Sequence, residues 1–123
     1  MRILVIDDED TIRNLVIAIV RMAGHEAVGA KDGSEGLKLN RALHADLVIT
    51  DLCMPGIDGM KVVSEVKSYA PGTGFIIMTG EEYERDVSIL NQSRLPGSAY
   101  KLAKPFSIDQ LLDLMDEACH SSP

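Results

Sequence analysis

The sequence predicts an α/β fold in which five parallel strands alternate with helices in a single domain. Short, continuously apolar runs recur along the chain, as expected for strands buried on both faces of a sheet. Between these runs, apolar residues return at the spacing of amphipathic helices. The alternation of the two patterns favours a doubly wound parallel sheet with helices on both faces.

The first half of the pattern begins with a strand predicted over residues 2–6, which stops at the acidic run Asp7 to Asp10. Apolar residues at helical spacing follow, and Gly24 is a plausible cap at the end of this first helix. Residues 26–30 form a weaker second strand, and a second helix is expected over about 34–43.

The third strand is the centre of the sequence pattern. Residues 47–50 are apolar and mostly β-branched, Asp51 follows them directly, and Pro55-Gly56 then turns the chain. The strand therefore delivers Asp51 to the carboxyl end of the sheet, where open α/β sheets place their ligands. A third helix is expected over 60–69.

The last part of the chain continues the alternation. Residues 75–78 form an apolar strand that ends at Thr79, and the next helix, from about Glu81, has a thin apolar stripe. We expect that fourth helix to be the least stable one. A short fifth strand over 99–102 leads to Lys104, and a final helix with a clean apolar face completes the pattern.

The expected strand order is 2-1-3-4-5, which puts the ends of the first and third strands side by side. One domain spans 1–120, and residues 121–123 form a short frayed tail.

The net charge of −7 argues against direct nucleic-acid binding, which depends largely on lysine and arginine. No apolar run approaches the ~20 residues that cross a membrane. Two cysteines without metal or redox spacing, and no secretory leader before them, lead us to expect a cytoplasmic protein.

The strand ends bring Asp7, Asp8 and Asp51 to neighbouring positions, with Thr79 and Lys104 on the strands beside them. Two carboxylates about 4 Å apart repel by roughly 4 kcal/mol at an effective dielectric constant near 20, so three of them favour a bound cation. Mg²⁺ suits this set because it prefers oxygen ligands and commonly binds one or two carboxylates together with a phosphate.

With Mg²⁺ and the Lys104 ammonium nearby, Asp51 becomes a usable nucleophile toward a phosphorylated donor. Thr79 can hydrogen-bond a phosphoryl oxygen of the resulting aspartyl phosphate. Taken alone, the acidic run and Thr79 could serve only as helix caps. Their combination with Asp51 and Lys104 favours a functional site instead.

The predicted strand ends carry several short motifs: Asp7-Asp8-Glu9, Asp51 with the following Met54-Pro55-Gly56-Ile57-Asp58-Gly59, Thr79-Gly80, and Lys104-Pro105-Phe106. In this order and at these separations, the motifs resemble the receiver domain of two-component response regulators. The resemblance covers residues 2 to about 118 and implies a CheY-like, flavodoxin-like fold.

The resemblance implies that Asp8, Asp51 and the backbone carbonyl of Cys53 ligate Mg²⁺ directly, whereas Asp7 contacts the ion through water. It also implies that Lys104 pairs with the phosphoryl group and precedes a cis proline. Cys53 and Glu81 match variable positions that the family places beside the path of the water that hydrolyses the aspartyl phosphate. Glu81 is not among the residues that the resemblance assigns to Mg²⁺. We expect Glu81 to influence hydrolysis without being needed for phosphotransfer.

One position departs from the family pattern. Receivers usually carry an aromatic residue three positions before the lysine, where Lys101 stands here, and Tyr100 comes one residue earlier. A one-residue shift in a strand turns a side chain to the other face, so either a bulge restores the register or Tyr100 is not the switch residue. We favour the second interpretation.

The resemblance implies that Asp51 accepts a phosphoryl group from phosphohistidine on a sensor histidine kinase or a histidine phosphotransfer protein. The phosphorylated domain would then signal to a target or output domain through its fourth helix, fifth strand and fifth helix. The oligomeric state stays open, with a homodimer among the alternatives.

Two other functions compete with this interpretation. A small Mg²⁺-dependent phosphohydrolase would need an acid two residues after the nucleophile, where Cys53 stands, and Glu81 is the only substitute. A protein-binding module that is never phosphorylated would not require the complete set of acids.

Overall fold

The computed structural model describes residues 1–80 and 99–120. Its five strands form one parallel sheet in the order β2-β1-β3-β4-β5, which confirms the order expected from the sequence. The predicted fourth helix, with Glu81, lies outside the described residues. The strands are β1 (Arg2–Ile6), β2 (Glu26–Ala30), β3 (Leu47–Asp51), β4 (Gly74–Thr79) and β5 (Ala99–Ala103).

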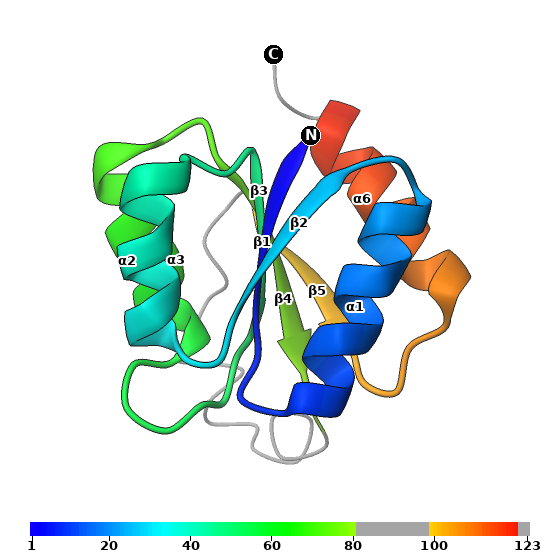
Figure 1. The fold of residues 1–123 in the computed structure, drawn as a ribbon, viewed down its shortest axis with the longest axis horizontal. Coiled ribbons are helices and arrows are strands. Elements are labelled where there is room, and N and C mark those ends of the chain that lie inside the picture. Colours follow the sequence, from blue (N-terminus) through cyan, green and yellow to red (C-terminus); the bar gives the residue numbers. More distant parts are fainter. Residues whose placement is uncertain (81–98, 121–123) are drawn as a thin grey trace.

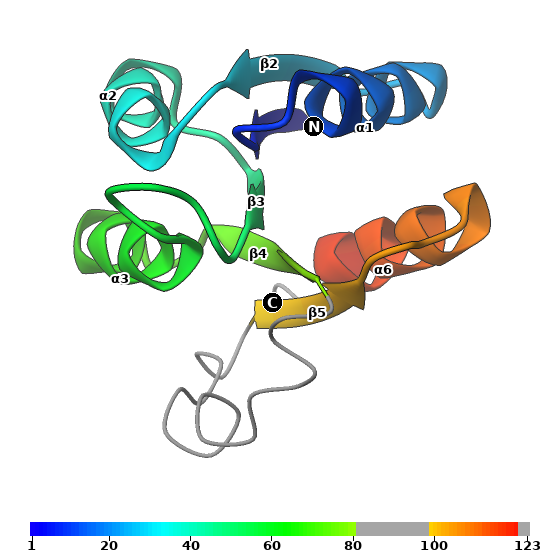
Figure 2. The ribbon, with the colours of Figure 1, turned by 90° about the horizontal axis from the view of Figure 1, so that it is seen from below.

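Helices cover both faces of the sheet, as Figures 1 and 2 show. Helices α1 and α6 lie on one face, and α2 and α3 lie on the other. Within residues 1–80 and 99–120, no helix has the length and apolarity that crossing a membrane requires. The helices are α1 (Asp10–Met22), α2 (Gly33–Leu43), α3 (Gly59–Tyr69) and α6 (Ile108–His120).

Two apolar clusters form the core, one on each side of the sheet. Alternate residues of the central strand β3 supply both: Ile49 belongs to the cluster under α1 and α6, and Val48 to the cluster under α2 and α3. All five residues of β3 are buried. This burial on two faces explains why the third strand has a continuous apolar sequence.

Two helices begin slightly earlier than their apolar patterns indicate, because aspartates cap them. The side chain of Asp32 accepts a hydrogen bond from the backbone nitrogen of Glu35, and that of Asp58 accepts one from Lys61. The Asp58 cap starts α3 directly after the loop that follows Asp51. The path of the chain around Asp51 is thus fixed at both ends, by β3 and by α3.

Candidate functional site

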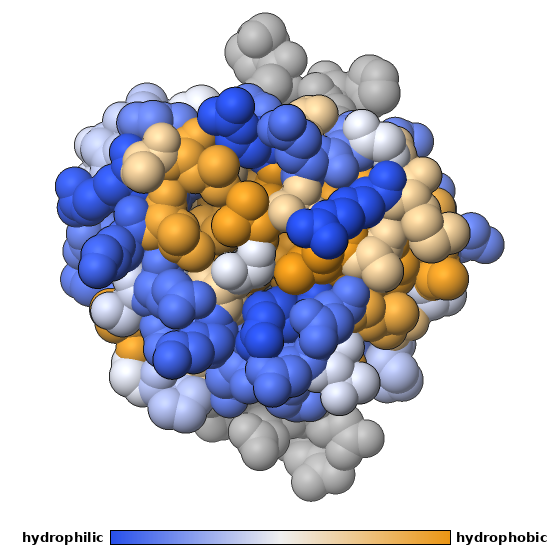
Figure 3. Space-filling view, in the orientation of Figure 1, coloured by the Kyte–Doolittle hydropathy of each residue, from blue (hydrophilic) through white to orange (hydrophobic). Residues whose placement is uncertain are grey.

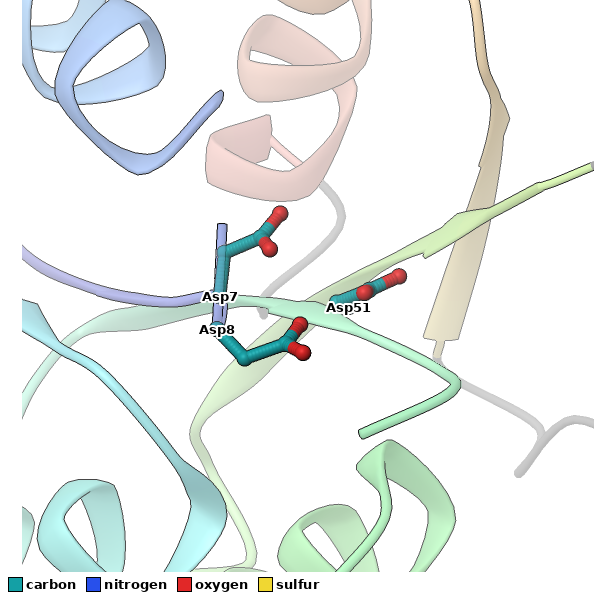
Figure 4. Close-up of side chains that lie close together, drawn as sticks. All are labelled: Asp7, Asp8 and Asp51. Atoms are coloured by element: carbon teal, nitrogen blue, oxygen red, sulfur yellow. The ribbon is translucent and has the colours of Figure 1, made fainter. Parts of the chain in front are cut away.

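Three carboxylates meet where the parallel strands end. Asp7 and Asp8 follow β1, and Asp51 is the last residue of β3. One carboxylate oxygen from each lies within 4.8 Å of the others, and Figure 4 shows the three groups converging. Hydrophilic residues gather along this lower edge of the molecule in Figure 3. The structure therefore brings together residues that are 44 positions apart in the sequence.

Asp7 is completely buried, and its polar atoms are hydrogen-bonded. Its backbone nitrogen donates to the carbonyl of Ala30 on β2 at 3.1 Å. Its carboxylate accepts from the backbone nitrogen of Glu9 at 2.9 Å and from Lys104 Nζ at 3.2 Å. A buried carboxylate needs such partners because desolvation otherwise makes its charged form very costly.

Lys104 connects two of the three acids. Its Nζ lies 3.2 Å from Oδ2 of Asp7 and 3.5 Å from Oδ1 of Asp51, and its backbone nitrogen donates to the carbonyl of Thr79 at 2.7 Å. Burial lowers the pKa of Lys104, but the charges of Asp51 and Asp7 outweigh burial and raise it. The ammonium therefore stays charged at the site. The expected cis peptide bond between Lys104 and Pro105 is confirmed.

Asp51 carries a strongly shifted pKa. Burial is the main cause of its rise from the ordinary value of 3.8 to about 6, and the neighbouring charges of Asp7 and Asp8 act in the same direction, while Lys104 opposes the shift. By formal charge, the three carboxylates outnumber the single Lys104 ammonium that contacts two of them. The excess of negative charge and the hard oxygen donors fit a divalent cation such as Mg²⁺.

Thr79 presents a buried hydroxyl at the same edge. Its side chain is 0% exposed, and its Oγ1 has no hydrogen-bond partner among the residues that the structure describes. The hydroxyl of Thr50, also buried, instead donates to the carbonyl of Asp51 at 3.0 Å. An unpaired buried hydroxyl is costly, so Thr79 is well suited to donate to an incoming oxygen atom.

The backbone of Asp51 is held by the start of α3. A Cβ atom on Gly59 would lie 2.4 Å from the carbonyl oxygen of Asp51 and 2.9 Å from the Cα of Leu52. Only glycine allows this close approach. Cys53, whose carbonyl the family resemblance assigns to Mg²⁺, lies exposed in the loop between β3 and α3.

Tyr100 lies on the face of the sheet opposite to Lys101. The β4–β5 pairing runs in continuous register, with Tyr100 opposite Ile76 and Lys101 opposite Ile77. Tyr100 packs against the cluster under α1 and α6. No bulge therefore interrupts the described β4–β5 pairs. The register supports our interpretation that Tyr100 does not occupy the position of the family's switch residue.

The chain matches the family model of the response regulator receiver domain over residues 3–116. It is a response regulator receiver domain. Two curated relatives differ in how much of their length this chain spans. The regulatory protein AtoC of Escherichia coli is 35% identical over 89% of this chain, which spans 23% of that protein. Sporulation initiation phosphotransferase F of Bacillus subtilis is 30% identical over 91% of this chain, which spans 88% of it.

Solved receiver structures share the fold. A receiver domain protein from Clostridium thermocellum has a TM-score of 0.81 at 30% identity, covering 95% of this chain and 92% of its own. The chemotaxis protein CheY4 of Vibrio cholerae has a TM-score of 0.82 at 26% identity, covering 95% and 97%. Receivers are signalling domains that accept a phosphoryl group and use Mg²⁺, and they interact with histidine kinases or phosphotransfer proteins.

One residue at the site was not identified by sequence reasoning. The guanidinium of Arg13 donates to the backbone carbonyl of Asp7 at 2.9 Å and also binds Asp10. The only signal in the sequence is the opposite charge of residues 10 and 13, one helical turn apart. That spacing is common on helix surfaces, so it could not point to the acid cluster.

Proposed function

We propose that Asp51 is the phosphoryl acceptor of this receiver and that Lys104 and Thr79 assist it. The observation that carries the proposal is the convergence of three carboxylates, with Lys104 in contact with Asp7 and Asp51. An Asp51 carboxylate oxygen attacks the phosphorus atom of a phosphohistidine. The new P–O bond forms as the P–N bond breaks, and the electron pair of that bond returns to the imidazole.

Asp8, Asp51 and the Cys53 carbonyl would hold Mg²⁺ directly, and Asp7 would hold it through water. The ion, when bound, supplies positive charge that offsets the negative charge gathering on the phosphoryl oxygens. Asp51 lies beside the Lys104 ammonium, which draws the donor phosphate toward the nucleophile. The buried Thr79 hydroxyl then donates to a phosphoryl oxygen.

The phosphorylated state would signal by a conformational switch. A new dianionic group at Asp51 attracts Thr79 and Lys104, which end β4 and follow β5 respectively. We propose that the surface conveying this change to a partner is formed by the predicted fourth helix, β5 and α6. An output domain, a separate target or a second copy of the chain could occupy it.

The donor we propose is a sensor histidine kinase or a histidine phosphotransfer protein, encountered in the cytoplasm, where receivers typically act. Hydrolysis of the aspartyl phosphate would be slow and would depend on Cys53 and Glu81, which match the variable positions that the family places beside the path of attacking water. A phosphohydrolase would instead turn over repeatedly. Incubation with acetyl phosphate distinguishes a receiver from a phosphohydrolase. A receiver takes up one phosphoryl group and loses it slowly.

Mass spectrometry after incubation with acetyl phosphate and Mg²⁺ tests the proposal. The parent chain should gain one phosphoryl group, and Asp51→Asn should gain none. Asp113→Asn is a matched control because it removes an exposed carboxylate on α6, away from the site. Labelling of Asp51→Asn at the parental level would disprove the assignment of Asp51.

A further inference from the structure

Arg13 is a cation beside the acid cluster to which the proposed chemistry gives no role. It lies on α1, and its side chain is 16% exposed. Its Nη1 donates to the backbone carbonyl of Asp7 at 2.9 Å, and its Nη2 donates to the carboxylate of Asp10. The guanidinium therefore joins the end of β1 to the start of α1, across the position of Asp8.

The hydrogen bond to Asp7 also restrains Asp8. A peptide group is planar, so the carbonyl oxygen of Asp7 and the Cα of Asp8 move as one rigid unit. The nitrogen and the carboxylate of Asp7 have their own partners, Ala30, Glu9 and Lys104. Among the contacts described at this turn, the Arg13 bond is the one that holds the peptide leading into exposed Asp8.

The sheet provides space for Arg13 at its edge strand. A Cβ atom on Gly29 of β2 would lie 3.3 Å from Cδ of Arg13 and 2.7 Å from Cδ1 of Ile17. The aliphatic part of Arg13 thus packs directly on the backbone of β2. A guanidinium that is packed along its stem and hydrogen-bonded at both Nη atoms has one well-defined position.

We propose that Arg13 is a positioning residue for the Mg²⁺ site, where it holds the Asp7–Asp8 peptide so that the Asp8 carboxylate faces Asp51. This inference rests on the proposed function, because the orientation of Asp8 matters only if the acids bind a divalent cation. Residues that orient metal ligands typically change metal affinity about 10–100-fold when they are removed.

If Arg13 acted only through its charge, its removal would have the opposite effect on the affinity for Mg²⁺. Removing a cation near three carboxylates strengthens the binding of another cation. A weaker affinity for Mg²⁺ after removal of Arg13 therefore identifies positioning rather than charge. Arg13→Lys adds a second comparison, since it keeps the charge but lacks the planar fork that reaches both partners.

Arg21 offers a matched control on the same helix. Its guanidinium donates to the carbonyl of Ala27 on β2 at 3.1 Å, so it also joins α1 to β2 through a backbone carbonyl. It contacts β2 near the start of that strand, whereas Asp7 binds Ala30 at the end. Arg21→Ala therefore removes a similar structural contact without touching the acid cluster.

Isothermal titration with Mg²⁺, without any phosphodonor, tests the inference. We expect Arg13→Ala to bind Mg²⁺ about tenfold more weakly than the parent, and Arg13→Lys to lose less. Arg21→Ala should keep the parental affinity. Thermal unfolding without Mg²⁺ should show that both alanine variants stay folded at the temperature of the titration, so that a loss of Mg²⁺ affinity confined to Arg13→Ala reflects positioning rather than general destabilisation.

Each other result has a definite meaning. If Arg13→Ala binds Mg²⁺ as tightly as the parent or more tightly, the inference is overturned while the proposed function stands. An equal loss in Arg21→Ala also overturns it, because the effect would then come from α1 packing in general. If the parent itself binds no Mg²⁺, both the inference and the proposed metal site fail.

Discussion

The amino ends of the strands and their carboxyl ends, called here the amino edge and the carboxyl edge of the sheet, carry similar residue types in very different surroundings. At the amino ends of the strands, Arg2 pairs with Glu26 at 3.4 Å, and the two side chains are 49% and 76% exposed. At the carboxyl ends, Lys104 is 17% exposed and pairs with Asp7, which is completely buried. Exposed pairs contribute little to stability, whereas buried charges are costly to leave unpaired.

The balance of charge differs as well. Near the amino edge, Asp46 accepts a hydrogen bond from the backbone nitrogen of Arg2, and Glu26 pairs with the Arg2 side chain. At the carboxyl edge, three acids lie close together and one lysine contacts two of them, and the pKa of Asp51 rises to about 6 mainly because of burial. The comparison teaches that the carboxyl edge keeps a binding site at the expense of stability.

Removal of Lys104 should produce the largest difference in the free energy of unfolding between variants at the two edges. Lys104→Met leaves Asp7 and Asp51 without their shared cation, so we expect the free energy of unfolding at pH 7 to fall by about 3 kcal/mol. Arg2→Met, at the amino edge, should cost less than about 1 kcal/mol. Urea unfolding without Mg²⁺ measures both values. Equal losses would show that the two edges do not differ energetically.

A glycine at each edge gives the next comparison. Gly59→Ala places a methyl group against the backbone of Asp51, and we expect a loss of about 2–3 kcal/mol in the free energy of unfolding. A methyl group on Gly72 would meet no described neighbour within 4 Å, so Gly72→Ala should be nearly neutral. Chemical denaturation checks both. A tolerated Gly59→Ala would mean that the loop after β3 is less tightly fixed than the contacts indicate.

Asp51→Asn should stabilise the protein. The carboxyl has a higher pKa in the folded chain, about 6, than its ordinary value of 3.8, so the folded state binds more protons between these values. Stability therefore falls as pH rises through that window, and it stays lower at neutral pH. We expect Asp51→Asn to gain about 3 kcal/mol at pH 7 and nothing below about pH 3.

The control for this gain is Asp46→Asn at the amino edge, which should change stability by less than about 0.5 kcal/mol. Unfolding curves recorded across the pH range without Mg²⁺ provide the measurement. A gain for Asp51→Asn that does not vary with pH would contradict the proposed cause, which is the burial of a charge.

The smallest effect is expected from Tyr100→Phe. The ring packs under α1 and α6, on the face opposite to Lys101, so loss of the hydroxyl should leave phosphoryl acceptance intact. Labelling by acetyl phosphate, followed over time, measures this. A large loss of acceptance would show that Tyr100 takes part in the site despite its position in the strand.

The sequence predicted the parts of this molecule that depend on local pattern. Continuous apolar runs located β1, β3 and β4, and their ends located Asp7, Asp51 and Thr79, whereas Lys104 followed a short fifth strand. The contact of Arg13 with Asp7 could not be predicted, because it depends on how α1 is rotated on β2 and on the space above Gly29. The face occupied by Tyr100 likewise required the β4–β5 register.

The central claim is that the clustered carboxylates bind a divalent cation at the carboxyl edge. Carbon-13 NMR of the Asp51 carboxyl group, titrated with pH in the absence and presence of Mg²⁺, tests it most directly. The expected pKa is about 6 without the ion, and Mg²⁺ should lower it because a bound cation favours the charged carboxylate. An ordinary pKa near 3.8 that does not respond to Mg²⁺ would contradict the claim.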